Sequence, residues 1–314
     1  MKHTLKVTIL MLALFFMAQV IGLLIVNQYI DHKQLEETGQ VTFIKLPYNL
    51  EPPKVSTTTA FIYIIVAIIL GTLFLLFLIK LELGFFWKLW FFISIVIVLT
   101  VAFTPFIRVP YGMHIALGIA FILSVWRLTK PNFFVHNFTE LFVYGGLAAI
   151  VVRWLDVISV FVLLILISLY DMYAVWKSRH MIKMAQFTAD QKVFAGMFLQ
   201  YKEDRKKLTN KIAMSPKIST QKVGSANSVK SAILGGGDIG FPLIFAGVVM
   251  KDLMLRHSAI IGFLETLIIV FFVTLALAYL FWKGEKEKFY PAMPYLSLGC
   301  LAGWLVVLAI EYFV

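Results

Sequence analysis

Two aspartates lie within apolar segments of membrane-spanning length, and they are the residues of this chain best suited to chemistry. Asp171 lies in VFVLLILISLYDMYAVW, and Asp238 lies in SAILGGGDIGFPLIFAGVVM. A carboxylate at membrane depth is energetically costly, so such residues usually have a function. Two carboxylates that meet share one proton, and the pair can then act as general base and general acid on a bound carbonyl group.

The composition places both aspartates in a membrane protein. The 314 residues are 61% hydrophobic and 14% charged, and the mean hydropathy is +0.88. Soluble domains do not have this balance. We therefore predict an all-α polytopic membrane protein, in the cell membrane, with about nine transmembrane helices. Their approximate ranges are 7–28, 58–79, 85–106, 110–126, 138–152, 155–176, 231–250, 258–281 and 290–313.

The distribution of Lys and Arg predicts the orientation and explains the net charge of +11. With the N-terminus inside and the C-terminus outside, these residues concentrate on the cytoplasmic side. The charge thus follows membrane sidedness, and we predict the lipid bilayer rather than nucleic acid as a partner. The chain divides into 1–176 with the first six helices, a basic cytoplasmic loop at 177–230, and 231–314 with the last three helices.

The basic loop is predicted to have two parts. Apolar residues recur at helical spacing in 181–201, which predicts an amphipathic helix on the inner membrane face. These residues are Phe187, Phe194, Met197, Phe198 and Tyr201. Residues 205–230 are polar and rich in Ser, Thr and Lys, which is typical of a flexible linker. Such a connection lets the sixth and seventh helices pair freely.

The two aspartates are predicted to lie at the same depth. Asp171 is near the inner end of an outside-to-inside helix, and Asp238 is near the inner end of the next helix, which runs the other way. At a rise of ~1.5 Å per residue, both lie about 8–10 Å below the inner surface. On depth alone, the pair fits a protease as well as a channel or transporter that uses the acids to relay protons or cations.

Glycine and proline surround Asp238 and favour the protease. Glycines permit close backbone approach, and a proline inside a helix removes a hydrogen-bond donor. We expect a loosened backbone that offers N–H and C=O groups to an extended peptide by strand addition. The residues are Gly235, Gly236, Gly237, Gly240 and Pro242.

Other polar residues in the spans give weaker signals. His114 has no HExxH partner, and no GxSx motif lies in a span, so we predict neither a metal nor a nucleophilic serine, and no cofactor. Glu265 is expected to have a packing or hydrogen-bonding role. Glu140 and Asp156 lie near span ends, where their side chains can extend to water at little cost.

Three short motifs follow one another along the chain, on the sixth, seventh and ninth predicted spans. They are Leu169-Tyr170-Asp171, Gly235-x-Gly237-Asp238 and Pro291-Ala292-x-Pro294. They resemble the YD, GxGD and PALP motifs of the presenilin and signal peptide peptidase family of intramembrane aspartyl proteases. Asp238-Ile239-x-x-Pro242 looks like the form found in signal peptide peptidases and archaeal homologues, whereas the predicted orientation is like that of presenilin. This mixture and the compact length look like an archaeal presenilin homologue. Gly236 and Met293 depart from the family pattern, which has leucine at both positions.

The resemblance implies that Asp171 and Asp238 form the catalytic pair of an aspartic endopeptidase. Its substrates would be transmembrane helices, such as remnant signal peptides or membrane anchors. The residues that it implies around the pair are Tyr170, Gly235, Gly237, Pro242, Pro291, Ala292 and Pro294. A channel or transporter is the main alternative. A prepilin-type peptidase and a catalytically idle scaffold are further ones.

Overall fold

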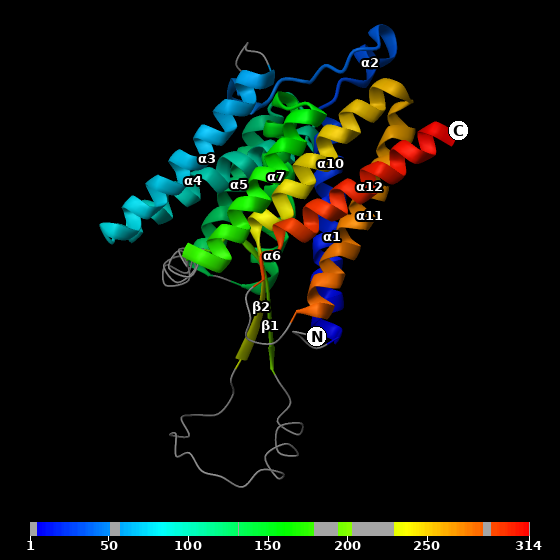
Figure 1. Cartoon of the computed structure of the whole chain (residues 1–314). Coiled ribbons are helices and arrows are strands. Elements are labelled where there is room, and N and C mark those ends of the chain that lie inside the picture. Colours follow the sequence, from blue (N-terminus) through cyan, green and yellow to red (C-terminus); the bar gives the residue numbers. More distant parts are fainter. Residues whose placement is uncertain are drawn as a thin grey trace, which may run out of the picture.

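The structure is a computed structural model that describes residues 5–50, 57–130, 132–178, 194–202, 229–284 and 290–313. These residues form a bundle of long helices (Figure 1). The helices are α1 (Leu5–Gln28), α3 (Thr57–Lys80), α4 (Gly84–Phe103), α5 (Gly112–Thr129), α6 (Phe133–Val151), α7 (Val157–Tyr173), α10 (Gly236–Arg256), α11 (Ala259–Lys283) and α12 (Met293–Phe313). The predicted all-α, multi-pass membrane fold is confirmed.

Among the described residues, 8 helices are long and apolar enough to cross a membrane, and α10 is the long helix that does not meet this standard. Its sequence includes Asp238, Lys251 and Asp252, which lower its hydropathy. The exact number of nine spans therefore stays a prediction. Short elements join the helices: α2 (His32–Thr38), η1 (Pro47–Asn49), η2 (Thr104–Phe106), η3 (Val152–Trp154) and η4 (Ala174–Ser178).

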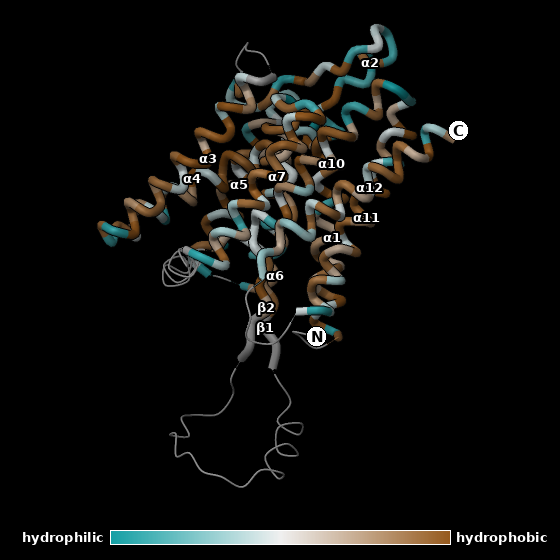
Figure 2. Tube along the Cα trace, in the orientation of Figure 1, coloured by the Kyte–Doolittle hydropathy of each residue, from teal (hydrophilic) through white to brown (hydrophobic). Residues whose placement is uncertain are grey.

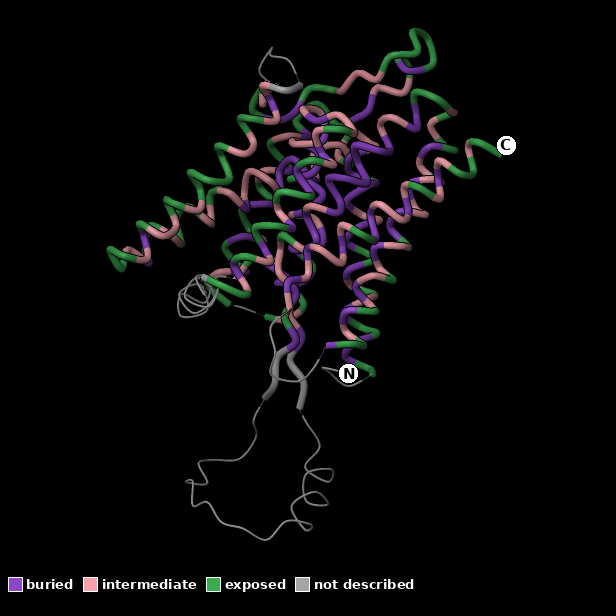
Figure 3. The backbone as a smooth tube through the Cα atoms, viewed as in Figure 1, coloured by how far each residue is buried: buried purple, intermediate pink, exposed green. Residues whose placement is uncertain are grey.

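Helix α10 forms the centre of the bundle. Nearly every residue from Ile239 to Met254 is buried, and the helix contacts α1, α6, α7, α11 and α12. Buried residues gather along it in Figure 3. Helix α3 lies at the periphery, and only 6% of its most apolar stretch is buried. The residues of this helix are largely hydrophobic (Figure 2). An apolar helix that has few protein neighbours is stable against lipid tails, as expected for a membrane protein.

A two-stranded antiparallel hairpin precedes α10. Strands β1 (Gly196–Lys202) and β2 (Val229–Gly235) pair so that Gly196 lies opposite Gly235. The predicted amphipathic helix over 181–201 is therefore wrong for 196–201, and residues 181–193 lie outside the described residues. The predicted helix start at 231 is also wrong, because α10 begins at Gly236. The predicted linker at 205–230 lies outside the described residues, except for 229–230 in β2.

The hairpin and the first residues of α1 lie at one end of the bundle, whereas α2 and the C-terminal end lie at the other (Figure 1). This arrangement agrees with the prediction that the N-terminus and the basic loop share one side of the membrane. The side that faces the cytoplasm remains a prediction from the positive charges.

Gly303 allows close contact between α12 and α11. A Cβ atom at this position would lie 2.6 Å from the Ile269 Cα atom, which is backbone and cannot rotate away. Gly303→Ala is expected to lower the free energy of unfolding by about 1–3 kcal/mol, as overpacking does. Gly118→Ala is the matched control, since a Cβ there would have no neighbour within 4 Å. Thermal unfolding in detergent, followed by circular dichroism, should separate the two variants, and equal losses would contradict this account of the packing.

Candidate active site

Asp171 lies near the end of α7 and contacts the start of α12. Its side chain is buried, and its Oδ2 atom accepts a hydrogen bond from the Met293 N–H at 3.1 Å. The Ala292 N–H also donates to this carboxylate. The first N–H groups of a helix have no partner within the helix, and the helix dipole favours an anion there. The Pro-Ala-Met-Pro element is thus brought against Asp171, as its motif suggested.

A second contact fixes α12 beside α7. The Ser168 Oγ atom lies one turn before Asp171 and shares a hydrogen bond of 2.8 Å with the Ser297 Oγ atom. Pro294 is the second residue of α12, where a missing N–H costs nothing because helix starts leave these donors unpaired. The regular first turn of α12 can therefore present the Met293 N–H to Asp171.

Asp238 is the third residue of α10 and directly follows the hairpin. The Gly235 N–H donates a hydrogen bond back to its carboxylate. Since Gly235 is the N-cap of α10, this contact is the acidic half of a capping box. Helix α7 packs against α10, and the Asp171 carboxylate acts electrostatically on Asp238. The two predicted acids thus belong to one site.

The backbone around Pro242 remains helical, which corrects the expectation that this segment is loosened. Pro242 has no N–H to donate to the Asp238 carbonyl four residues earlier. The next carbonyl, that of Ile239, accepts a hydrogen bond of 2.9 Å from Gln19 Nε2 on α1. The extended backbone instead precedes Asp238, in β2. Gln19 was missed from the sequence, although an amide within the apolar run 7–28 was its signal.

A cavity of about 630 Å³ lies between the end of α7 and the start of α12. It includes Pro291 and Pro294, two of the residues expected to shape a cleft. Its lining is Met172, Trp176, Tyr290, Pro291, Pro294, Tyr295 and Leu298. This cavity borders the segment that holds Asp171, so it can receive apolar side chains of a peptide at the site.

Two other predicted residues lie less close to the chemistry. Tyr170 is 52% exposed, so it lies on the surface of the bundle rather than between the aspartates. Gly237 is exposed, and a Cβ atom there would meet the Phe241 ring at an ordinary 3.6 Å. In this conformation the space around position 237 does not demand a glycine.

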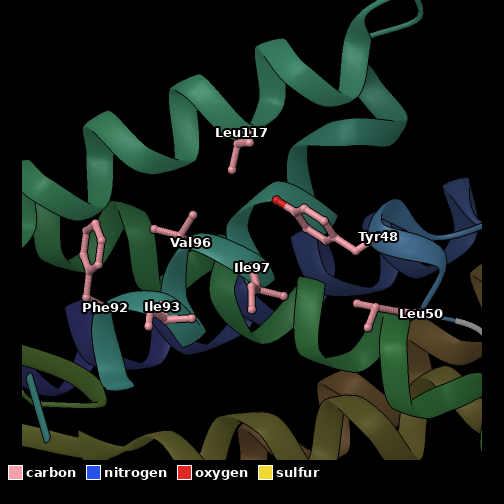
Figure 4. Close-up of a pocket in the computed structure, with 7 residues that line it drawn as sticks. All are labelled: Tyr48, Leu50, Phe92, Ile93, Val96, Ile97 and Leu117. Carbon is pink, nitrogen blue, oxygen red and sulfur yellow. The ribbon is translucent and has the colours of Figure 1, made fainter. Parts of the chain in front are cut away.

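A second cavity, shown in Figure 4, has a different character. It has a volume of about 430 Å³ and lies beside α4 and α5. Its lining is Tyr48, Leu50, Phe92, Ile93, Val96, Ile97 and Leu117. These side chains include no carboxylate, amine or imidazole, so this cavity offers no acid or base for hydrolysis.

The outer edge of β1 is closed by polar side chains of α5 and α6. Antiparallel pairs alternate between bonded and non-bonded, and the Gly236 N–H to Ala195 carbonyl bond of 3.2 Å sets the phase. Alternate residues of β1 therefore direct their backbone groups away from β2. The contacts are Arg127 Nη2 to the Phe194 carbonyl at 2.9 Å, His136 Nε2 with the Gly196 carbonyl at 2.8 Å, Asn137 Nδ2 to the Phe198 carbonyl at 2.9 Å, and the Phe198 N–H to Asn137 Oδ1 at 3.2 Å.

The same alternation leaves an outer edge on β2. The backbone groups of Ser231 and Ile233 point away from β1, because these residues lie opposite Gln200 and Phe198. Ile233 is 56% exposed. This outer edge of β2 ends at Gly235, three residues before Asp238.

The position of Glu140 corrects the expectation that its side chain extends to water. Its side chain is 2% exposed and pairs with Arg127, whose side chain is 3% exposed. The Tyr144 hydroxyl donates to its other oxygen. Asp156 has a structural role, since its Oδ1 atom accepts the Ser159 N–H at 2.8 Å and caps α7.

Glu265 belongs to a charged cluster at the opposite end of α10 from Asp238. His257 Nε2 lies 4.0 Å from Glu265 and 3.1 Å from Glu311. Arg256 also pairs with Glu311, at 3.1 Å. These ion pairs join the ends of α10 and α12 to α11, which agrees with a packing role for Glu265.

Comparisons with known proteins are consistent with this geometry. A family model described as signal-peptide peptidase, presenilin aspartyl protease matches residues 12–312. No curated protein matched the sequence. Among solved structures, a presenilin family intramembrane aspartate protease in space group C222 has a TM-score of 0.59 and 17% identity, over 96% of this chain and 99% of that one. A presenilin family intramembrane aspartate protease in space group P2 has a TM-score of 0.54 and 18% identity, over 96% of each chain.

Proposed function

Because the chain belongs to the signal-peptide peptidase and presenilin family of aspartyl proteases, we propose that Asp171 and Asp238 are the catalytic pair of this intramembrane protease. The observation that carries the proposal is the placement of these two carboxylates, near the end of α7 and at the start of α10, on helices that pack against each other. A metal and a covalent intermediate are not needed for this chemistry, because a carboxyl pair can activate water directly.

The proposed reaction is general acid–base hydrolysis. The ionised aspartate removes a proton from water while the oxygen attacks the peptide carbonyl, and the protonated aspartate donates a hydrogen bond to the carbonyl oxygen. When the tetrahedral intermediate collapses, the C–N bond breaks and the leaving amine takes a proton from the pair. The shared proton is a property of the pair as a whole and is not assigned to either aspartate.

The proposed substrates are transmembrane helices, such as remnant signal peptides or membrane anchors, in the cell membrane. A helix hides its carbonyl groups in its own hydrogen bonds, so a substrate must unwind before it can react. The outward-facing backbone groups of Ser231 and Ile233 support strand addition as the way in which the unwound segment is held. The cavity beside Pro291 and Pro294 supports a place for its apolar side chains.

The test is cleavage of a fluorogenic transmembrane peptide by the purified protein in detergent, with products identified by mass. We expect cleavage that a transition-state analogue of aspartyl proteases abolishes, because such an inhibitor mimics the tetrahedral intermediate held between two carboxyl groups. Cleavage that is insensitive to this inhibitor would contradict the proposed pair. An absence of cleavage over several peptides, combined with ion flux through liposomes, would favour the channel alternative.

A further inference from the structure

A buried polar cluster connects the hairpin to the start of α10, and the reaction described above does not use it. We infer that Tyr144, which Glu140 and Arg127 hold in place, is a positioning residue that sets which peptide bond reaches the aspartates. This inference rests on the proposed function. It concerns the position of cleavage along the substrate rather than the chemistry of cleavage.

The cluster is fixed by contacts on every side. Tyr144, Glu140 and Arg127 are 5%, 1% and 4% exposed. The Tyr144 hydroxyl donates to Glu140, and Glu140 pairs with Arg127. Arg127 also donates to Thr139 at 3.1 Å and to the Phe194 carbonyl at 2.9 Å. A buried ion pair with several further hydrogen bonds is rigid, so it can serve as a reference point for the strand that it binds.

Tyr144 occupies the space beside the start of α10. A Cβ atom added to Gly236 would lie 2.8 Å from the Tyr144 hydroxyl oxygen and 3.2 Å from its Cε1 atom. The tyrosine ring thus fills the room that a side chain at 236 would need. The Tyr144 ring can therefore lie against position 236 because the glycine there has no side chain.

The contact between Tyr144 and Gly236 lies next to both the end of β2 and Asp238. The Gly236 N–H extends the hairpin by bonding the Ala195 carbonyl at 3.2 Å, and Gly235 bonds the Asp238 carboxylate. A peptide paired with β2 is thus placed relative to Asp238 by the position of residues 235 and 236. A strand that shifts by one residue turns its side chains to the other face, so small changes here should alter the cleaved bond.

The experiment is a double-mutant cycle of Tyr144→Phe and Gly236→Ala, read by product masses and by kcat and KM separately. Each single variant is expected to lower kcat by about tenfold, equivalent to about 1.4 kcal/mol, and to yield products cut at neighbouring bonds. In Tyr144→Phe the hydroxyl oxygen at 2.8 Å from the added methyl group is gone, and the nearest remaining atom is the ring Cε1 at 3.2 Å. The double variant should therefore lose no more than either single one. Thermal unfolding confirms that each variant is folded.

Thr266→Val is the matched control, because it also removes one buried hydroxyl group. That hydroxyl donates to the Gly262 carbonyl within α11 at 2.7 Å. The cleavage positions and kcat of Thr266→Val should therefore equal those of the wild type. Unchanged cleavage positions in Tyr144→Phe, or losses that multiply in the double variant, overturn the inference while leaving the proposed function intact. A wild-type protein that cleaves no peptide defeats the proposed function, and the inference with it.

Discussion

Asp238→Asn and Asp171→Asn are each expected to lower kcat for peptide hydrolysis by about 10²–10⁴-fold, the range for loss of a general acid or base. An amide cannot take a proton from water or carry the proton that the pair shares. It keeps the shape of the carboxyl group, and the Asn oxygen can still accept the N–H of Gly235 or Met293. The fold is therefore preserved, and single-turnover cleavage of a transmembrane peptide measures the chemical step.

Asp252→Asn is the control for the aspartate variants. Asp252 lies at the opposite end of α10, where its side chain is 30% exposed and pairs with Arg256 at 2.6 Å. Its loss should leave kcat unchanged. Since the two site aspartates act as a unit, Asp171→Asn combined with Asp238→Asn should be no slower than the slower single variant. Retained cleavage in either single variant would remove that residue from the catalytic pair.

Glu140→Ala is expected to lower the free energy of unfolding by about 3–5 kcal/mol, because removing one member of a buried ion pair leaves the other charge without compensation. Arg127 would keep its charge with its side chain 3% exposed, and the Tyr144 hydroxyl would lose its acceptor. Chemical denaturation in detergent, followed by circular dichroism, measures the change.

The matched comparison is Asp252→Ala, which removes an exposed ion pair. The side chains of Arg256 and Asp252 are 48% and 30% exposed, so solvent screens their attraction and the expected loss is about 0–1 kcal/mol. Similar losses for Glu140→Ala and Asp252→Ala would show that the first pair does not stabilise the fold through its burial.

The sequence predicts the helices and the two acids because their signals are local. An apolar run such as 258–281 identifies its helix by length alone, and α11 begins and ends within two residues of that range. Asp171 and Asp238 stand out because apolar neighbours surround them. The Pro291–Pro294 element is predictable because proline is favoured at a helix start, where its N–H is not needed and its φ angle already fits.

The hairpin was missed because its residues satisfy two periods at once. Phe194, Phe198 and Tyr201 are spaced as on a helix, whereas Met197 and Leu199 are buried on one face of a strand. The partner strand begins at Val229, far along the chain. Hydrogen bonds between such distant segments leave no periodic signal in either one.

The contacts of Glu140 were missed for a related reason. Its partner Arg127 lies on another helix, at a position that the charge distribution assigned to a cytoplasmic segment. Sequence position near a span end predicts access to water, yet packing of α5 against α6 removes that access. Only the arrangement of the helices shows that the two charges meet.

Among the described residues, polar side chains bond the outer edge of β1 but not that of β2, so the proposed strand addition would hold one peptide at a time. Arg127, His136 and Asn137 occupy the outer side of β1. A peptide that joins the hairpin would therefore pair with β2. In strand addition, backbone pairing gives affinity whatever the sequence, whereas pockets for side chains give specificity. Unrelated substrates that pair with β2 should therefore compete for one place, with a stoichiometry of one peptide per chain.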